Sequence, residues 1–426
     1  MSVAVDDRAR SWLPCTSACS RTYGDQVSSP AVTSVLTDRT YRRLFSAQVI
    51  ALLGTGLLTV ALSLLAFEVA PERAGAVLAT ALTLKMVAYV AVAPMITAVT
   101  GRWSPRAVMM GADAVRAAVA LALPWVDQVW HVYVLIVVLQ SASATFTPTF
   151  QAVIPVVLPD ERQYTRGLSL SRLAYDLEAV ASPVVAAGLL LVMSYHWLFV
   201  GTALGFVLSA VFVLRSGLSV QGAAPLSSFR SRATAGVSIF RQRRSLRTLF
   251  LLDIAAACAV ATVLVNTVVV VREDLSRGSP SVAVALAVFG AGSMAVALAT
   301  PRILERRQDL SFMITGGGLC AGLLIVAIPA VGDRGSWSVL LVVWCALGAA
   351  SSMVLTPSGR VVNAAVTSGE RPAAFAAHFS LSHACYLAAY PVAGWVGSLT
   401  SVAVATGVLG AAAVAATGAA MATRPR

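Results

Sequence analysis

The sequence predicts an all-α membrane protein with twelve transmembrane helices in two pseudo-symmetric six-helix bundles. Three observations point to this fold. The 426 residues are 58% hydrophobic and only 12% charged, with a mean hydropathy of +0.80, whereas soluble domains carry about 25% charged residues. Twelve apolar stretches follow one another along the chain, and short motifs of the first half recur in the second.

The recurring motifs indicate two copies of one bundle. They are separated by 209, 209 and 211 residues, which is half the chain. The pairs are Thr147-Pro148 with Thr356-Pro357, Glu161-Arg162 with Glu370-Arg371, and Leu168-Ser-Leu-Ser-Arg172 with Phe379-Ser-Leu-Ser-His383. Two related bundles with a substrate site between them at the membrane midplane are the usual plan of a secondary transporter.

Each apolar stretch is long enough to cross about 30 Å of hydrocarbon as a helix. The stretches cover residues 46–67, 75–99, 107–125, 132–154, 167–192 and 197–214, then 249–271, 281–300, 311–331, 338–356, 373–396 and 401–421. We therefore predict a disordered polar segment at 1–40, bundles at 41–214 and 248–422, a cytoplasmic linker at 215–247, and a cytoplasmic tail at 423–426.

The distribution of basic residues predicts the orientation, because cytoplasmic loops hold an excess of Lys and Arg. With both termini inside, 24 of the 31 basic residues are cytoplasmic, four are in the opposite loops, and three are within spans. The net charge of +12 then reflects topology and attraction to anionic lipid rather than nucleic-acid binding. The linker is read as a topogenic basic segment, with a surface amphipathic helix near residues 231–245 as the alternative.

Together, the twelve spans, the basic linker, the Arg-bearing loop between spans 2 and 3 and the repeat resemble the major facilitator superfamily. Within it, Tyr41-Arg-Arg-Leu-Phe-Ser-Ala-Gln48, Ala112-Asp-Ala-Val-Arg116 and Pro159-Asp-Glu-Arg162 resemble bacterial exporters of the macrolide-efflux and siderophore-exporter type. The resemblance covers residues 40–422. It implies alternating access, with the two bundles rocking about a central site.

The resemblance also implies gating residues. The loop after span 2 of the superfamily pairs an acid with arginines, but here Arg102 and Arg106 are present and Gly101 stands where the acid belongs. The counterpart in the second half keeps Glu305 beside Arg306, so gating contacts are expected to rely more on that half. The alternative is that these arginines only set the topology.

Two prolines occupy matching points of the repeats. Ser182-Pro-Val-Val-Ala-Ala-Gly188 in span 5 and Tyr390-Pro-Val-Ala-Gly394 in span 11 are degenerate forms of the Gly-Pro-rich motif that antiporters of the superfamily carry. Pro183 and Pro391 are therefore expected to kink two gating helices, a feature that favours export over import.

Charged side chains inside span 5 are the strongest functional signal, because an ionisable group at the bilayer centre costs at least about 2.5 kcal/mol. Arg172 and Asp176 are four residues apart and can form a pair. Glu178 lies on another face and must find a different partner. An unpaired carboxylate at this depth can exchange a proton, so the three residues are predicted to carry proton coupling. The alternative is a neutralised network that only fixes helix packing.

Span 11 adds His378 and His383, and span 2 adds Lys85 at a similar depth. In the superfamily, spans 2 and 11 pack against each other, so Lys85 is expected near the histidines. The histidines are read as hydrogen-bonded packing residues, as a proton relay, or, together with Cys385, as part of a soft-ligand metal site; we predict no metal site.

Spans 1, 4, 7 and 10 line the cavity in the superfamily. Their polar residues predict a mildly polar cavity with few aromatic side chains. The predicted cavity residues are Gln48, Lys85, Gln140, Gln151, Asp253, Asn266, His378 and His383. Asp253, close to the cytoplasmic end, is either a cation-attracting entrance or a loop anchor.

Enzymatic motifs are missing: the chain has no Walker-type loop, no HExxH and no paired CxxC. We therefore predict a secondary transporter rather than an enzyme, without cofactors. The expected function is proton-coupled efflux of an amphiphilic drug-like or siderophore-like compound by a monomer in the bacterial cytoplasmic membrane. The alternatives are a heavy-metal or metalloid exporter, suggested by the His, Cys and acid set, and a transport-inactive sensor or scaffold, suggested by the incomplete loop motif.

Overall fold

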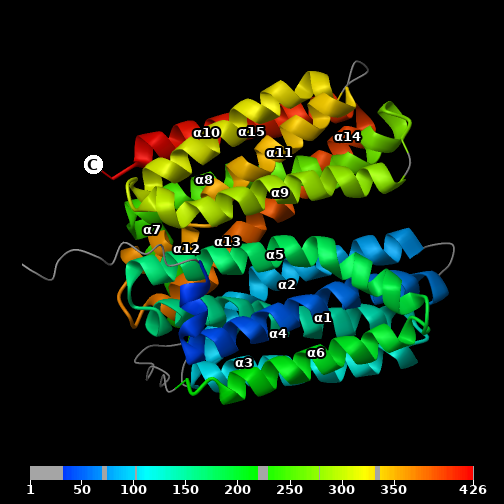
Figure 1. Ribbon diagram of the computed structural model, residues 1–426, viewed down its shortest axis with the longest axis vertical. Helices are drawn as coiled ribbons and strands as arrows, with labels where there is room; N and C mark the ends of the chain where they lie inside the picture. The colour runs from blue at the N-terminus through cyan, green and yellow to red at the C-terminus, as the bar shows by residue number, and fades with distance from the viewer. Residues whose placement is uncertain are drawn as a thin grey trace, which may run out of the picture.

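The computed structural model describes residues 32–69, 74–100, 103–218, 229–277, 279–331 and 336–425. Helices make up almost all of this part of the chain, and they form two bundles that lie one above the other in Figure 1. The lower bundle comes from the first half of the chain and the upper one from the second half. The two-bundle architecture predicted from the repeat is confirmed.

The first bundle contains six long helices. They are α1 (Arg39–Val69), α2 (Ala74–Thr100), α3 (Pro105–Ala122), α4 (Val129–Val157), α5 (Glu161–Leu190) and α6 (His196–Arg215). A short 3-10 helix, Val32–Thr37, precedes α1. Order therefore begins before residue 41, since Asp38 caps α1 by accepting from the Tyr41 backbone N–H. Residues 1–31, for which disorder was predicted, lie outside the described residues.

The second bundle has the same plan with more broken helices. It comprises α8 (Arg244–Val269), α9 (Ser279–Leu304), α10 (Asp309–Ala327), α11 (Trp337–Leu355), α12 (Ser358–Ala365), α13 (Arg371–Pro391), α14 (Gly397–Leu399) and α15 (Val402–Thr423). A π-helical turn, Val392–Val396, follows Pro391 at the end of α13.

Within the described residues, ten helices are long and apolar enough to cross a membrane, and α5 is the eleventh if its two parts count as one span. The parts Glu161–Ala179 and Val184–Leu190 meet at 41°. The remaining helix of the predicted twelve is the 21-residue α13, which carries the buried His378 and the half-buried His383. The structure is thus a multi-pass membrane protein.

Small residues set the spacing of helices in the second bundle. A Cβ atom at Gly292 of α9 would lie 2.0 Å from the Cys345 carbonyl oxygen, and one at Gly348 of α11 would lie 2.0 Å from that of Phe289. Neither position can hold a larger residue without separating the helices. Close backbone approach through small residues is how membrane helices pack in the absence of a hydrophobic driving force.

A buried ion pair stabilises the first bundle away from its interface with the second. Arg116 of α3 pairs with Asp113 one turn earlier, and Asp113 also accepts from the Ser209 hydroxyl of α6 at 2.7 Å. The Arg116 guanidinium lies between the rings of Phe146 and Phe206, 4.6 and 4.5 Å from their centroids. The two charges neutralise each other inside the bundle, although Arg116 Nε has no hydrogen-bond partner among the described residues.

The linker forms a helix, α7 (Phe229–Gln242), which packs against α13, α8 and α2. Gly236 permits the close approach, since a Cβ there would lie 2.3 Å from the Ala373 carbonyl oxygen of α13. The segment near residues 231–245, for which an amphipathic helix was the alternative prediction, is thus largely helical, and its helix contacts both bundles. Residues 219–228 of the linker lie outside the described part of the chain.

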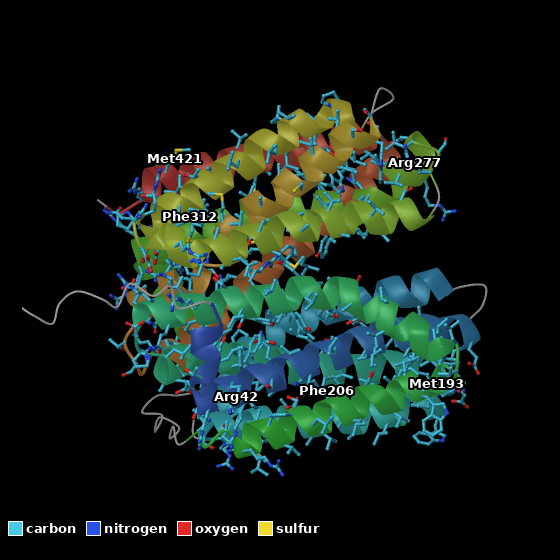
Figure 2. All side chains as sticks on the ribbon, in the orientation of Figure 1. Arg42, Met193, Phe206, Arg277, Phe312 and Met421 are labelled. Carbon is cyan, nitrogen blue, oxygen red and sulfur yellow. The ribbon has the colours of Figure 1, made fainter. Side chains whose placement is uncertain are left out.

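We call the end of the molecule where α1 begins and α15 ends the basic end, because Arg243, Arg244, Arg360 and Arg424 lie there. In Figure 1 this end carries α7, α12 and the C-terminus. Figure 2 shows Arg42 and Met421 towards the basic end and Met193 and Arg277 at the opposite end.

Candidate functional site

Three side chains join the bundles near the middle of the membrane-spanning region. Arg172 Nη2 of α5 lies 2.8 Å from Asp176 Oδ1, which confirms the predicted pair. The hydroxyl of Ser293, on α9 in the second bundle, accepts from Arg172 Nε at 3.1 Å and donates to Asp176 Oδ2 at 2.6 Å. Asp176 and Ser293 are buried. The predicted pair is therefore part of an interface between the bundles.

Glu178 has weaker partners. Its Oε1 accepts from the Ser182 hydroxyl one turn later, at 3.3 Å, and Lys85 of α2 is close enough for an electrostatic attraction. A Cβ atom at Gly56 of α1 would lie 2.5 Å from the same Oε1 and 2.0 Å from Ser182 Oγ. Gly56 thus makes room for Glu178, which is half-buried between α1 and α5.

Lys85 also lies beside Tyr89, one member of a cluster of aromatic side chains. Its Nζ lies 5.7 Å from the centroid of the Tyr89 ring, and that ring contacts His383 and Phe379 of α13, with centroids 4.8 and 5.0 Å away. Tyr89 donates its hydroxyl proton to Gln140 Oε1 of α4 at 3.1 Å. The predicted approach of Lys85 to a histidine of span 11 is confirmed for His383.

The rings continue along α13. His383 faces Tyr386 with centroids 6.0 Å apart, and Tyr386 stacks on Tyr390 at 5.7 Å. The sequence predicts few aromatic side chains in the cavity when only spans 1, 4, 7 and 10 are taken to line it. The structure brings them from α2 and α13.

His378 lies elsewhere. Its Nε2 is 3.2 Å from Asp253 Oδ2 of α8, and both side chains are buried within the second bundle. Asp253 is therefore neither a loop anchor nor an exposed entrance. Both residues stand out in the sequence, but their contact does not, because spacing alone reveals no contact between residues 125 positions apart.

The remaining predicted cavity residues are dispersed. Gln48 is buried and accepts from the Ser171 hydroxyl at 3.0 Å, within the first bundle. Asn266 is buried in α8, and Gln151 is half-buried in α4. The structure thus gathers Lys85, Gln140 and His383 of the predicted set around Tyr89. Gln48, Asn266 and Gln151 lie elsewhere.

One predicted gating residue makes a contact between the bundles. Glu305 Oε1, after α9, lies 3.7 Å from Arg162 Nε of α5. Arg106 instead donates to the Leu214 carbonyl oxygen at 2.5 Å inside the first bundle, and Arg306 is exposed in a turn. Arg102 and the side chain of Pro183 lie outside the described residues.

A stronger contact at the basic end was not predicted. Arg360 of α12 pairs with Asp309 Oδ2 of its own bundle at 3.0 Å and with Glu161 of α5 in the other bundle. It also contacts the Thr165 hydroxyl. A pocket of about 1020 Å³ opens beside these residues. We call Arg360, Asp309, Glu161 and Thr165 the Arg360 latch. The only sequence feature that could have indicated this contact is the position of Arg360 in a polar stretch after span 10.

Glu370 is the repeat counterpart of Glu161 but behaves differently. Its Oε2 accepts from the Thr367 backbone N–H at 2.9 Å and from the Thr367 hydroxyl at 3.0 Å. These hydrogen bonds hold the pKa of Glu370 below its usual value. The repeat therefore uses one acid between the bundles and the other to close the turn before α13, where it also lies 3.9 Å from Arg243.

Among the described residues, no three His, Cys, Asp or Glu side chains come together as a metal site would require. Cys385, which the metal alternative invoked, donates to the Leu381 carbonyl oxygen of its own helix at 3.2 Å.

Known proteins share this fold and part of the sequence. Macrolide efflux protein A of Enterococcus faecalis is 28% identical over 173 residues, which are 38% of this chain and 53% of that protein. The protein of that name from Streptococcus pyogenes is 28% identical over 192 residues, 42% of this chain and 47% of its own length. The chain thus matches only about half the length of these relatives. Uncharacterized MFS-type transporter YfiS of Bacillus subtilis is 25% identical over 267 residues, 60% of this chain and 62% of that protein.

Solved structures agree over nearly the whole chain. The human organic anion transporter MFSD10 superposes with a TM-score of 0.72 at 16% identity, covering 90% of this chain and 99% of that one. A bacterial homologue of the iron transporter ferroportin, in an outward-facing state, gives 0.69 at 15% identity, covering 90% and 98%. The sequence pattern of the Major Facilitator Superfamily matches residues 44–335. The chain therefore belongs to the major facilitator superfamily of membrane transporters.

Proposed function

We propose that this transporter exports an amphiphilic drug-like compound in exchange for protons. The observation that carries the proposal is the environment of Glu178, a half-buried carboxylate with one long hydrogen bond and a lysine nearby. An intramembrane acid of this kind is by default a functional residue. The relatives named macrolide efflux protein support the export direction and an amphiphilic substrate.

For Asp176 and Arg172 we propose a role in the contact between the bundles rather than in proton binding. Asp176 already accepts from Arg172 and Ser293 at 2.8 and 2.6 Å, so a proton would have to displace both partners. These residues hold the bundles together at mid-depth and transmit their movement. Glu178 is free to bind a proton when Lys85 is withdrawn.

The proposed cycle uses the closed basic end. The excess of arginine at this end supports a cytoplasmic location for it, and the Arg360 latch and the Glu305–Arg162 contact join the bundles there. In this state substrate leaves and Glu178 binds a proton from outside. Opening of the latch then lets the proton leave to the cytoplasm and a new substrate enter, so that the site holds one or the other.

The aromatic side chains fit such a substrate. Tyr89, His383, Tyr386 and Tyr390 offer ring faces along α2 and α13, and rings of this type bind apolar surfaces and cations on their faces. Gln140 and Lys85 supply polar contacts at one end of this row.

The test is substrate-driven proton release from energised everted vesicles. We expect a macrolide or a hydrophobic cation to release protons in the wild type, and Glu178→Gln to abolish the release. A siderophore and divalent metals complete the panel. Silence across the panel, with the protein present in the membrane, would refute the proposal.

The two alternatives have lost their supporting observations. The metal alternative relied on His378 and Cys385 with acids from elsewhere in the chain, but no three such side chains gather among the described residues, and Cys385 bonds within its own helix. The transport-inactive alternative relied on the missing acid after span 2, whereas the Arg360 latch joins the bundles at the same end.

A further inference from the structure

A second pair of titratable groups is buried in the second bundle, apart from Glu178. Asp253 and His378 have side chains only 1% and 10% exposed, and their nearest polar atoms are 3.2 Å apart. This contact lacks hydrogen-bond geometry. Both Asp253 oxygens and His378 Nε2 are without a hydrogen-bond partner. Three buried polar atoms are thus left without a hydrogen bond among the described residues.

The linker helix covers this pair. The ring of Phe240 on α7 stacks on the His378 imidazole, with centroids 6.2 Å apart and planes 9° from parallel. Phe240 is buried, and its helix also contacts α2 of the first bundle. A movement between the bundles therefore acts directly on the helix that covers the pair.

The charge of the pair depends on one proton. With a neutral imidazole, the Asp253 carboxylate is a buried charge without a counter-charge, which is costly in a membrane protein. One added proton makes the pair neutral overall, whichever of the two groups carries it. Cys385, Tyr386 and His383 of α13 interact electrostatically with the pair, and Arg172 of α5 interacts with Tyr386. Within the described residues, His378 is the only side chain with which Asp253 forms an ion pair.

We propose that Asp253 and His378 form a proton-binding site in the second bundle, and that Phe240 of the linker helix covers it on the side of the basic end. When the bundles separate at the basic end, α7 loses its contact with α2 and shifts on α13 to uncover the pair, which exchanges its proton with that side. The proposal goes beyond the proton exchange assigned to Glu178 and does not depend on it.

Proton counting tests the binding site. The purified full chain in lipid nanodiscs is taken from pH 8 to pH 5.5, and the protons bound are counted with a pH-indicator dye. An ordinary Asp, with a pKa of about 3.9, stays charged over this interval, so its replacement changes nothing. We expect Asp253→Asn to bind about one proton fewer than the wild type, because His378 then has no counter-charge. His378→Gln should lose the same proton, and the double variant should lose no more than either single variant.

The chain contains a matched control. Asp127 and His131 form a pair at 3.7 Å on an exposed surface. We expect Asp127→Asn to leave the proton count unchanged. An unchanged count for Asp253→Asn, or additive losses in the double variant, would overturn the proposed site. If Asp253→Asn does not fold, an unchanged count in His378→Gln would overturn it equally.

Histidine labelling tests the cover. Diethyl pyrocarbonate modifies accessible neutral imidazoles, and all four histidines of the chain are read in one digest. We expect Phe240→Ala to raise the labelling rate of His378 about tenfold and to leave that of His131 unchanged. Ile239→Ala, on the same helix, is the control and should have no such effect. Equal His378 labelling in the wild type and Phe240→Ala would overturn the covering role. Neither experiment requires substrate, so their failure is distinct from failure of proton-coupled export.

Discussion

The Arg360 latch leads to a prediction about the conformational equilibrium. Arg360 is 10% exposed and binds Asp309 within its own bundle and Glu161 across the interface. Glu161→Ala removes only the charge contact between the bundles. Arg360→Ala removes this contact, the contact with the Thr165 hydroxyl and the partner of Asp309. The two variants should therefore differ in size of effect.

The exposure of the acids determines the magnitudes. The Glu161 side chain is 75% exposed, so its ion pair is screened by water and contributes about 0.5 to 1 kcal/mol. Glu161→Ala should shift the ratio of closed to open basic ends about two- to fivefold. Arg360→Ala also loses hydrogen bonds between charged and partly buried groups, about 2 to 3 kcal/mol, which corresponds to a shift of about 30- to 150-fold.

The equilibrium can be followed by double electron–electron resonance. Spin labels at Val156 of α4 and Met421 of α15, both exposed, report the distance between the bundles at the basic end, in a background whose native cysteines are replaced. We expect Arg360→Ala to add a population with a longer distance and Glu161→Ala to add a smaller one. Glu370→Ala is the control, since Glu370 bonds Thr367 in the turn before α13 and lies 3.9 Å from Arg243, so neither contact reaches the first bundle. An unchanged distance distribution in Arg360→Ala would refute the latch.

Three further variants test other contacts. Gly56→Ala places a methyl group against the Glu178 carboxylate, and we expect substrate-driven proton release to fall severalfold in everted vesicles while the protein remains in the membrane. Asp113→Asn leaves Arg116 buried without a counter-charge, so unfolding in detergent should become easier by about 3 to 5 kcal/mol, with proton release per substrate unchanged in the folded fraction. Ser293→Ala removes the hydroxyl that joins α9 to Arg172 and Asp176 of α5. The same spin labels should then show a weaker preference, by about 1 kcal/mol, for the closed basic end. A wild-type distance distribution there would mean that Ser293 only fills space.

The sequence predicted the fold because hydropathy and repeated motifs can both be read directly along the chain. Each apolar stretch had to become a helix in lipid, and the repeat of Thr147-Pro148 as Thr356-Pro357 placed the boundary between bundles. The Arg172–Asp176 pair was predictable for the same reason, since four residues form one helical turn.

Contacts between distant helices were not predictable in this way. Ser293 reads as one small residue among many in α9, yet it joins the bundles. Asp253 and His378 were singled out separately, and only tertiary packing brings them together. In a chain this apolar, the sequence shows which polar residues must find partners but not which helices lie beside one another.

In the proposed cycle, Glu178 couples export to the proton gradient. The most direct measurement is accumulation of a radiolabelled macrolide in inside-out proteoliposomes, driven by an imposed pH gradient. The wild type should accumulate the compound against its gradient. Glu178→Gln should still exchange internal for external compound but should not accumulate it. Equal accumulation by Glu178→Gln and the wild type would contradict the account.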